Sequence, residues 1–194
     1  MAIKNQYNEN GFIAVHGGYA KLLSFQKSEI IYDGTVYFCK RFFKPRDRTI
    51  DQMVQAARSG KQNIAEASMA AATSKETEIK LTSVARASLE ELLLDYKDFL
   101  RTNKYIEWDK NHPYYQRMKT LNAIRDGNYE TFRRGIENPN PEICANVMIS
   151  LIKVATFLLN QQMKYLEEAF IKEGGIRERM TRARINERNK GNRQ

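Results

Sequence analysis

Apolar side chains recur three or four positions apart along four long stretches of the chain. This spacing places side chains on one face of an α-helix. It predicts helices over about residues 19–43, 48–71, 75–102 and 141–172. The third helix is the most regular, and the following residues share its predicted apolar line: Leu81, Val84, Ala85, Ser88, Leu92, Tyr96 and Phe99.

Residues that start or stop helices bound these stretches. Pro45 follows the first helix, and a proline cannot continue one. Thr73-Ser74-Lys75-Glu76 has the spacing of a capping box at the start of the third helix. Asn140 and Pro141 form a preferred pair of N-cap and first-turn residue, so they predict the start of the fourth helix.

These elements predict an all-α protein, an up-down four-helix bundle over residues 19–173. An insertion at about 103–140 separates its third and fourth helices; it is rich in aromatic and turn-forming residues, with a short helix expected at about 114–126. Residues 1–18 are predicted to form an N-terminal arm. Residues 174–194 begin with two glycines and form a basic tail, expected to be loosely ordered or to extend the fourth helix.

The second predicted helix carries a line of very small side chains beside its apolar face. This line consists of Ala56, Gly60 and Ala67. A glycine in the middle of a helix costs about 1 kcal/mol relative to alanine. We therefore predict that another helix packs closely against these three residues.

The charge balance indicates an anionic partner. Among 194 residues there are 32 Lys and Arg but only 23 Asp and Glu, which gives a net charge of +9. Such an excess suits nucleic acid, an acidic protein or a lipid surface. A soluble protein that merely happens to be basic is the plainer interpretation. The polar N-terminus and the lack of a long uninterrupted apolar run predict a cytoplasmic protein that does not enter a membrane.

Two clusters of cations are candidates for nucleic-acid binding. The first lies around Phe42, Phe43 and Pro45 and consists of Lys40, Arg41, Lys44, Arg46 and Arg48. The second lies in the tail and consists of Arg177, Arg179, Arg182, Arg184 and Arg188. Cations beside aromatic rings suit phosphate contact and base stacking. Both clusters are also compatible with ordinary solvated helix ends, and the tail arginines with pairing to nearby acids.

Residue types that support catalysis or metal binding are sparse. His16 and His112 are the only histidines, and neither follows a glutamate at the spacing of a di-iron helix site. Glycine-rich nucleotide motifs, zinc spacings and nucleophile elbows do not occur in the sequence. Cys39 and Cys144 are far apart and are expected to be buried singly. We therefore expect no enzyme activity, cofactor or metal.

Lys61 falls on the apolar side of the second predicted helix. An unpaired ammonium there would be costly. If the first two helices form a hairpin, Glu29 or Asp33 is the expected partner. The alternative is that the lysine stem runs outward and leaves its ammonium in water.

Large apolar residues occur on more than one side of the first predicted helix, including Phe25, Ile31, Phe38 and Phe43. One bundle has only one interior, so some of these residues are expected to face a second copy of the chain. The aromatic insertion could instead cover them within one chain.

Two short patterns resemble a known family. Ile64 and Glu66 end the second predicted helix, and Ser88-Leu89 with Glu91-Leu92 lies in the third. Over about residues 20–102 and 141–172, the chain resembles the four-helix-bundle family of 23S ribosomal RNA intervening-sequence proteins. That bacterial-type family also includes the accessory variability proteins of diversity-generating retroelements. Ala67 and Ala87 occupy positions where the family has glycine, so both positions remain small.

The insertion and the tail resemble the longer branch of that family. The resemblance implies rings of bundles, often pentamers, with a basic surface that contacts nucleic acid and no established enzymatic activity. We therefore expect a non-catalytic homo-oligomer that binds RNA or an RNA-protein complex through phosphate contacts. The alternative is an interaction scaffold whose basic face docks an acidic protein.

Overall fold

The computed structural model describes residues 18–191, and every regular element in this range is helical. The all-α prediction is confirmed. The arm predicted at residues 1–18 lies outside the described residues except for Gly18. In chain order the elements are η1 (Tyr19–Lys21), α1 (Leu23–Phe42), α2 (Arg48–Ala70), α3 (Lys75–Thr102), α4 (Pro113–Asn122), α5 (Tyr129–Ile136), α6 (Pro141–Glu173) and α7 (Ile176–Gly191).

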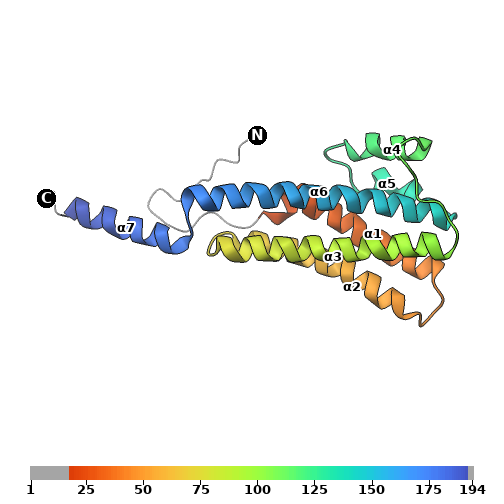
Figure 1. Ribbon diagram of the computed structural model, residues 1–194, viewed down its shortest axis with the longest axis horizontal. Coiled ribbons are helices and arrows are strands. Elements are labelled where there is room, and N and C mark those ends of the chain that lie inside the picture. Colours follow the sequence, from red (N-terminus) through yellow and green to blue (C-terminus); the bar gives the residue numbers. More distant parts are fainter. Residues whose placement is uncertain (1–17, 192–194) are drawn as a thin grey trace.

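Four long helices, α1, α2, α3 and α6, lie side by side (Figure 1). α1 contacts α2 and α6, and α3 contacts the same two helices. The short helices α4 and α5 pack on α6, and α5 also contacts α1. α7 extends beyond the opposite end of the molecule (Figure 1). The two ends of the long helices therefore have different surroundings.

The long helices enclose a continuous apolar core. Burying one large apolar side chain contributes about 1.5 to 3 kcal/mol to the free energy of unfolding. The largest fully buried side chains are Tyr96, Phe38, Phe132, Ile31, Met53, Ile64, Leu89, Leu92, Leu100, Ile136, Met148 and Leu151. They come from α1, α2, α3, α5 and α6, so the core joins all four long helices and one short one.

α6 is the most apolar helix of the molecule. By length and composition alone, the helical stretch Pro141–Asn189 could cross a membrane. However, 61% of its most apolar window is buried inside the protein. Such burial is typical of a core helix, and α6 packs against α1, α3, α4 and α5.

Side-chain caps define the starts of three long helices. Asp47 accepts a backbone hydrogen bond at the start of α2, and Asn140 does so at the start of α6 with Pro141 in its first turn. At the start of α3 the cap is Ser74, which accepts from a backbone N–H at 3.1 Å. The predicted capping box began one residue too early, because Thr73 and Ser74 are both good capping residues.

The small side chains of α2 lie in its buried face. Gly60 lies against α3, and a Cβ atom at this position would come within 2.7 Å of Cδ2 of Leu89. Ala56 and Ala67 are also buried. Glycine at position 60 leaves the space that Leu89 occupies, and this close approach is a physical reason for a glycine in mid-helix.

The bounds of two predicted helices differ from the structure, and one helix was not predicted. The first helix begins as the 3-10 turn η1, and α1 starts only at Leu23. α4 covers Pro113–Asn122 rather than 114–126, and α5 was not predicted. α5 has eight residues, of which only Phe132 and Ile136 are buried. Two apolar residues are too few to establish a helical period in a sequence.

The tail forms a separate helix, α7, rather than an extension of α6. Gly174 lies between them with a φ of 73°, a left-handed conformation that favours glycine and ends a right-handed helix. None of the described apolar side chains of α7 is buried. α7 is therefore held by few apolar contacts.

The prediction that Lys61 pairs with Glu29 or Asp33 is wrong. Its ammonium lies over the ring of Tyr32, 4.3 Å from the ring centroid, and forms no ion pair with Glu29 or Asp33. A cation above an aromatic face is stabilised by the negative potential of that face. The position of Lys61 opposite α1 was predicted, but the type of partner was not.

The apolar residues of the first helix are covered within one chain. Phe25, Ile31 and Phe38 are buried, and Phe43 is half-buried. α1 contacts α2 and α6 and is further covered by α5 and η1, so it has neighbours on more than one side. These residues therefore give no argument for a second copy of the chain.

Candidate functional site

The turn between α1 and α2 presents five cations to solvent. Lys40 and Arg41 lie in the last turn of α1, Lys44 and Arg46 in the connection, and Arg48 at the start of α2. All five are exposed, and no side chain among them forms a hydrogen bond or ion pair within residues 18–191. They can meet phosphate without first breaking an existing ion pair.

Packed aromatic rings hold this turn. The ring centroid of Phe38 lies 5.1 Å from that of Phe42 and 5.9 Å from that of Phe43. Phe43 in turn lies 5.6 Å from Phe99 of α3. Aromatic pairs at these separations stabilise a fold beyond the area they bury. The backbone that carries the cations is thus attached to the core.

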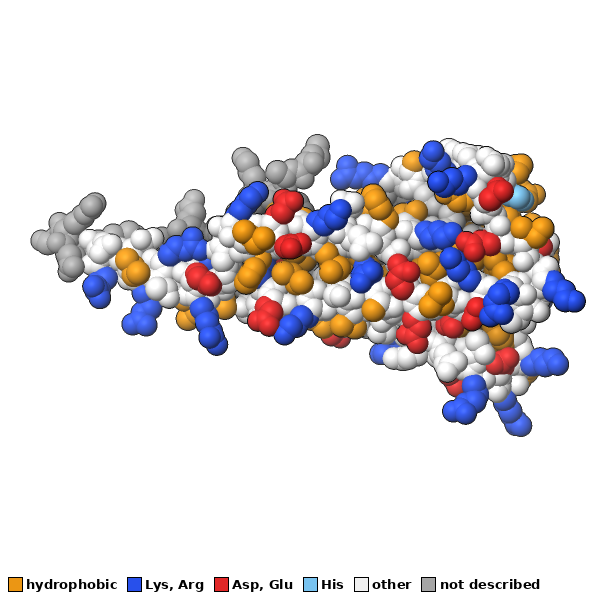
Figure 2. Space-filling model, viewed as in Figure 1, with side chains coloured by type: hydrophobic (Ala, Val, Ile, Leu, Met, Phe, Trp, Pro, Cys, Tyr) orange, Lys and Arg blue, Asp and Glu red, His pale blue; other side chains and the backbone are white. Residues whose placement is uncertain are grey.

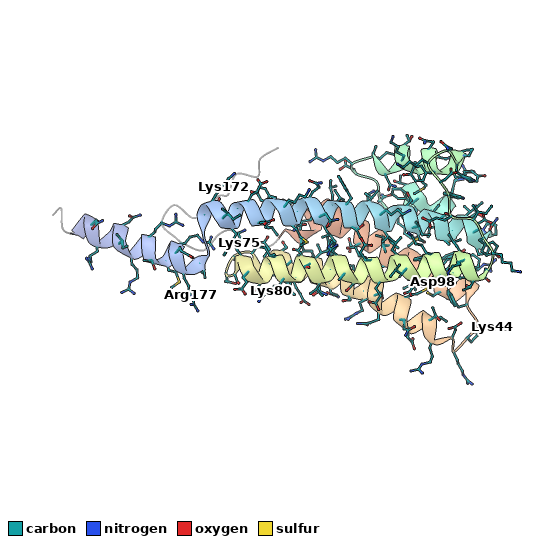
Figure 3. All side chains as sticks on the ribbon, viewed as in Figure 1. Lys44, Lys75, Lys80, Asp98, Lys172 and Arg177 are labelled. Atoms are coloured by element: carbon teal, nitrogen blue, oxygen red, sulfur yellow. The ribbon has the colours of Figure 1, made fainter. Side chains whose placement is uncertain are left out.

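Acidic residues lie beside the turn. A hollow of about 610 Å³ is lined by Asp47 and Lys44 of the turn and by Asp95 and Asp98 of α3. Burial raises the pKa of Asp95, and the charges of Glu91 and Asp98 raise it further. Figure 3 shows Asp98 and Lys44 at the same end of the molecule. These carboxylates disfavour an anionic ligand within the hollow and leave Lys40, Arg41, Arg46 and Arg48, which do not line it, for contact with phosphate.

The tail arginines have less freedom than those of the turn. Arg182 donates a hydrogen bond to the backbone carbonyl of Glu173. The guanidinium nitrogens of Arg179 are buried and have no hydrogen-bond partner among the described residues. The pKa of Glu76 is lowered mainly by a hydrogen bond from Lys80 and also by the charge of Arg177. Among the five predicted tail arginines, Arg184 and Arg188 are exposed and have no described partner.

The structure does not bring the two basic clusters together. Lys44 and Arg177 lie at opposite ends of the molecule (Figure 3), and blue side chains project from both ends (Figure 2). α3 has 28 residues and spans most of the distance between them. At 1.5 Å per residue, this is about 40 Å. A compact ligand cannot contact both clusters of one chain.

A groove between α4 and α6 was not predicted. It has a volume of about 380 Å³, within the range of small-ligand sites. Its lining is mostly apolar and aromatic, with a few polar groups: Trp108, Tyr115, Lys119, Asn122, Ala123, Asn146, Ile149, Ser150, Lys153, Val154, Phe157 and Leu158. The aromatic composition of the insertion was the one sequence signal for it.

The groove is held in shape by the side chain of Asn146 in α6. Its Oδ1 atom accepts a hydrogen bond from the backbone N–H of Trp108 at 2.8 Å. Its Nδ2 atom donates to the carbonyl of Ile106 at 2.9 Å. His112 caps α4, and its ring stacks on Trp108 with centroids 5.0 Å apart. The loop before α4 is therefore fixed to α6, and His112 has a structural role.

A second groove lies on the other side of α4, towards α5. It has a volume of about 230 Å³ and is lined by Trp108 and Tyr114 together with Arg117 and Arg134. Both arginines are exposed and form no ion pair within the described part of the chain. The region around α4 therefore adds cations and aromatic rings that neither predicted cluster contained.

Lys27 is a cation inside the protein. Its side chain belongs to α1, is 4% exposed, and its ammonium has no hydrogen-bond partner among the described residues. The ammonium lies 4.5 Å from the ring centroid of Phe132 in α5. Burial lowers the pKa of Lys27. Unlike the exposed cations, this charge opposes folding.

The described residues contain no group of three or more His, Cys, Asp and Glu side chains that could hold a metal ion. Cys39 and Cys144 are free and buried. Burial raises the pKa of each thiol to about 12. Both therefore stay protonated near neutral pH, and a protonated thiol is a poor nucleophile.

Comparisons with known proteins do not test the family resemblance. No protein-family model, curated protein or solved structure matches this chain. The relation to the intervening-sequence proteins therefore stays a prediction from the residues of α2 and α3.

Proposed function

We propose that this protein is a non-catalytic, cytoplasmic nucleic-acid-binding protein that contacts the phosphates of RNA, or of an RNA-protein complex, through the turn between α1 and α2. In this proposal, α1, α2, α3 and α6 form an up-down four-helix bundle. The segment with α4 and α5 is its insertion, and α7 is its basic tail. The preference for RNA comes from the family resemblance.

One observation carries the proposal. The five cations at the turn are exposed and form no ion pair with any described residue. Their backbone is attached to the core through aromatic packing, so little backbone conformational entropy is lost when they bind. An extended polyanion also suits the spacing of the two clusters. Duplex nucleic acid carries phosphates along its whole length, and about 40 Å corresponds to about twelve base pairs.

The test is a binding titration against single-stranded RNA, duplex RNA and duplex DNA over a series of salt concentrations. We expect affinity for all three, falling steeply as salt rises, because released counterions supply much of the binding free energy. An affinity that does not change with salt, or no binding at low salt, would contradict the proposal.

The second candidate is a scaffold that docks an acidic protein. The acidic hollow beside the turn favours it, because carboxylates of Asp95 and Asp98 repel a uniform polyanion but can meet a protein surface of mixed charge. Such a partner would show saturable binding in a pull-down, and added nucleic acid would displace it poorly. One stoichiometric protein partner together with weak nucleic-acid binding would favour the scaffold.

We also propose that the protein is a homo-oligomer, such as the pentamer that the family resemblance implies. Exposed apolar side chains on α3 and α6 outside the α4–α6 groove support this: Val84, Leu94, Tyr165 and Ile171. Exposed apolar residues that form one patch often mark an interface. Light scattering is expected to give a multiple of 22.6 kDa, and a monomer mass at micromolar concentration would rule the oligomer out.

A further inference from the structure

The α4–α6 groove offers flat aromatic surfaces from two helices. Tyr115 lies on its α4 side and Phe157 on its α6 side, and the buried Trp108 also lines the groove. Phe157 is 58% exposed, so much of its ring is free to contact a ligand. Planar nucleobases stack on such rings in proteins that bind single strands.

A buried polar atom in the groove lacks a partner among the described residues. Nδ2 of Asn122 donates a hydrogen bond to Oγ of Ser150 at 3.1 Å. Oδ1 of the same amide is buried and accepts no hydrogen bond from any of them. An unsatisfied buried acceptor is costly, so a rotation of the Asn122 side chain that exposes Oδ1 to a ligand donor in the groove is favoured. The amino and imino groups of nucleobases are such donors, and an Asn amide can pair with the edge of adenine.

Two lysines line the same groove. Lys153 forms an ion pair with Glu107 at 2.8 Å, whereas Lys119 forms none with any described residue. Lys119 is therefore free to contact an anionic group attached to a ligand. A base carries a phosphate at a short distance along its strand, so stacking, amide pairing and ion pairing can occur together.

From these three observations, we infer that the α4–α6 groove binds an unstacked base of a single-stranded nucleic acid, with its phosphate at Lys119. The inference rests on the proposed function and adds base recognition to the phosphate contacts of the turn. The α4–α5 groove is a weaker candidate because its described lining includes no buried polar atom without a partner. An ionised carboxylate ligand has no donor for Oδ1 of Asn122.

The single tryptophan of the chain, Trp108, lines this groove. Its fluorescence is therefore a probe of the site in the unmodified, full-length protein. We expect an adenine-rich RNA oligomer to quench this fluorescence and saturate, because a stacked base approaches the indole. A fully paired RNA duplex should bind with the same salt dependence but without quenching, because its bases are stacked inside the helix.

Three substitutions test the contacts. Phe157→Ala should weaken binding of the oligomer by about 5- to 150-fold, which corresponds to about 1 to 3 kcal/mol. Asn122→Ala and Lys119→Gln should each weaken it by about tenfold while leaving duplex binding unchanged. Phe170→Ala is the matched control, because Phe170 is an exposed aromatic residue of the same helix outside the groove. Circular dichroism melting establishes that each variant is folded.

The outcomes separate this inference from the function on which it rests. If single strands and duplexes bind equally with a steep salt dependence, without quenching and without an effect of Phe157→Ala, the base site is refuted and the proposed function stands. If no nucleic acid binds at low salt, both fail. Quenching by adenosine monophosphate at the same concentration as by the oligomer would refute the assignment to a strand, since it would indicate a free-nucleotide site.

Discussion

The two basic clusters carry similar charge on very different supports. At the turn between α1 and α2, the cations follow an α-helix whose last turns contribute Phe38 and Phe42 to the core. At the other end, α7 buries none of its described apolar side chains and is joined to α6 through Gly174. The sequence made both clusters candidates and did not rank them. The structure favours the turn, because its cations are both unpaired within the described residues and attached to a packed core.

The comparison teaches that the number of cations and their readiness to bind are separate properties. Ordering a loosely held segment costs about 1 to 2 kcal/mol per residue in backbone entropy. Cations on an ordered turn avoid most of that cost. Three of the five tail arginines also lie close to groups of their own chain, so the tail has fewer free cations than its sequence suggests.

The largest expected effect tests the turn directly. Replacing Lys40, Arg41, Lys44, Arg46 and Arg48 by Gln should flatten the slope of log affinity against log salt. The slope should decrease by about 0.9 for each phosphate that the variant no longer neutralises on duplex DNA, or by about 0.7 on single strands. If all five cations bind phosphate, the slope should change by about 4.5 on a duplex. An unchanged slope would reverse the comparison and assign binding to the tail.

The next effect tests the packing that supports the turn. Gly60→Leu should lower the free energy of unfolding by about 1 to 3 kcal/mol, because the new side chain would collide with Leu89. Gln62→Leu is the control, since Gln62 is exposed on the same helix. Urea denaturation measures both. Equal midpoints for Gly60→Leu and wild type would show that α2 and α3 do not approach as closely as described.

The next prediction concerns Lys27, a cation that is buried whereas those of the two basic clusters lie at the surface. Lys27→Met should raise the free energy of unfolding by about 1 to 2 kcal/mol near neutral pH, because it removes an unpaired charge from an apolar site. Lys21→Met is the control, since Lys21 is exposed. A decrease in stability would mean that the contact with Phe132 outweighs the cost of burying the ammonium.

The stabilities of wild type and Lys27→Met should depend differently on pH. The pKa of Lys27 is lowered from 10.5 in the folded state. Between the lowered pKa and 10.5, the unfolded chain binds a proton that the folded chain does not, so stability rises with pH in that window. Below the lowered pKa the penalty is fully present. The stability of wild type should therefore approach that of Lys27→Met as pH rises, while Tyr96 and Tyr129 ionise alike in both proteins.

The smallest expected effect comes from the tail. Removing residues 176–194 should change the free energy of unfolding by less than about 0.5 kcal/mol, because no described apolar side chain there is buried. The loss of Arg184 and Arg188, which are exposed and without described partners, should lower the salt slope by about 2 on a duplex if both contact phosphate. A larger decrease in stability would show that the hydrogen bond from Arg182 and the buried guanidinium of Arg179 fasten the tail to the body.

Much of the helical organisation could be predicted because helix formation depends on neighbours along the chain. The bounds of α2, α3 and α6 agree with the apolar period and with the caps at Asp47 and Asn140 to within a residue. The helix α5 shows the limit of this approach. Its capping box at Asn128 is a local signal, but an eight-residue helix has too few apolar positions to establish a period.

The sequence by itself determined the all-α class, the long helices, the small residues of α2 and the positions of both basic clusters along the chain. Only the tertiary structure decided what these residues meet: Tyr32 rather than a carboxylate at Lys61, acids beside the turn, and opposite ends for the two clusters. It also assembled the α4–α6 groove, in which Trp108 and Phe157 are 49 positions apart in sequence. The physical reason is that helical hydrogen bonds join residues four apart, whereas contacts between helices depend on how whole faces pack together.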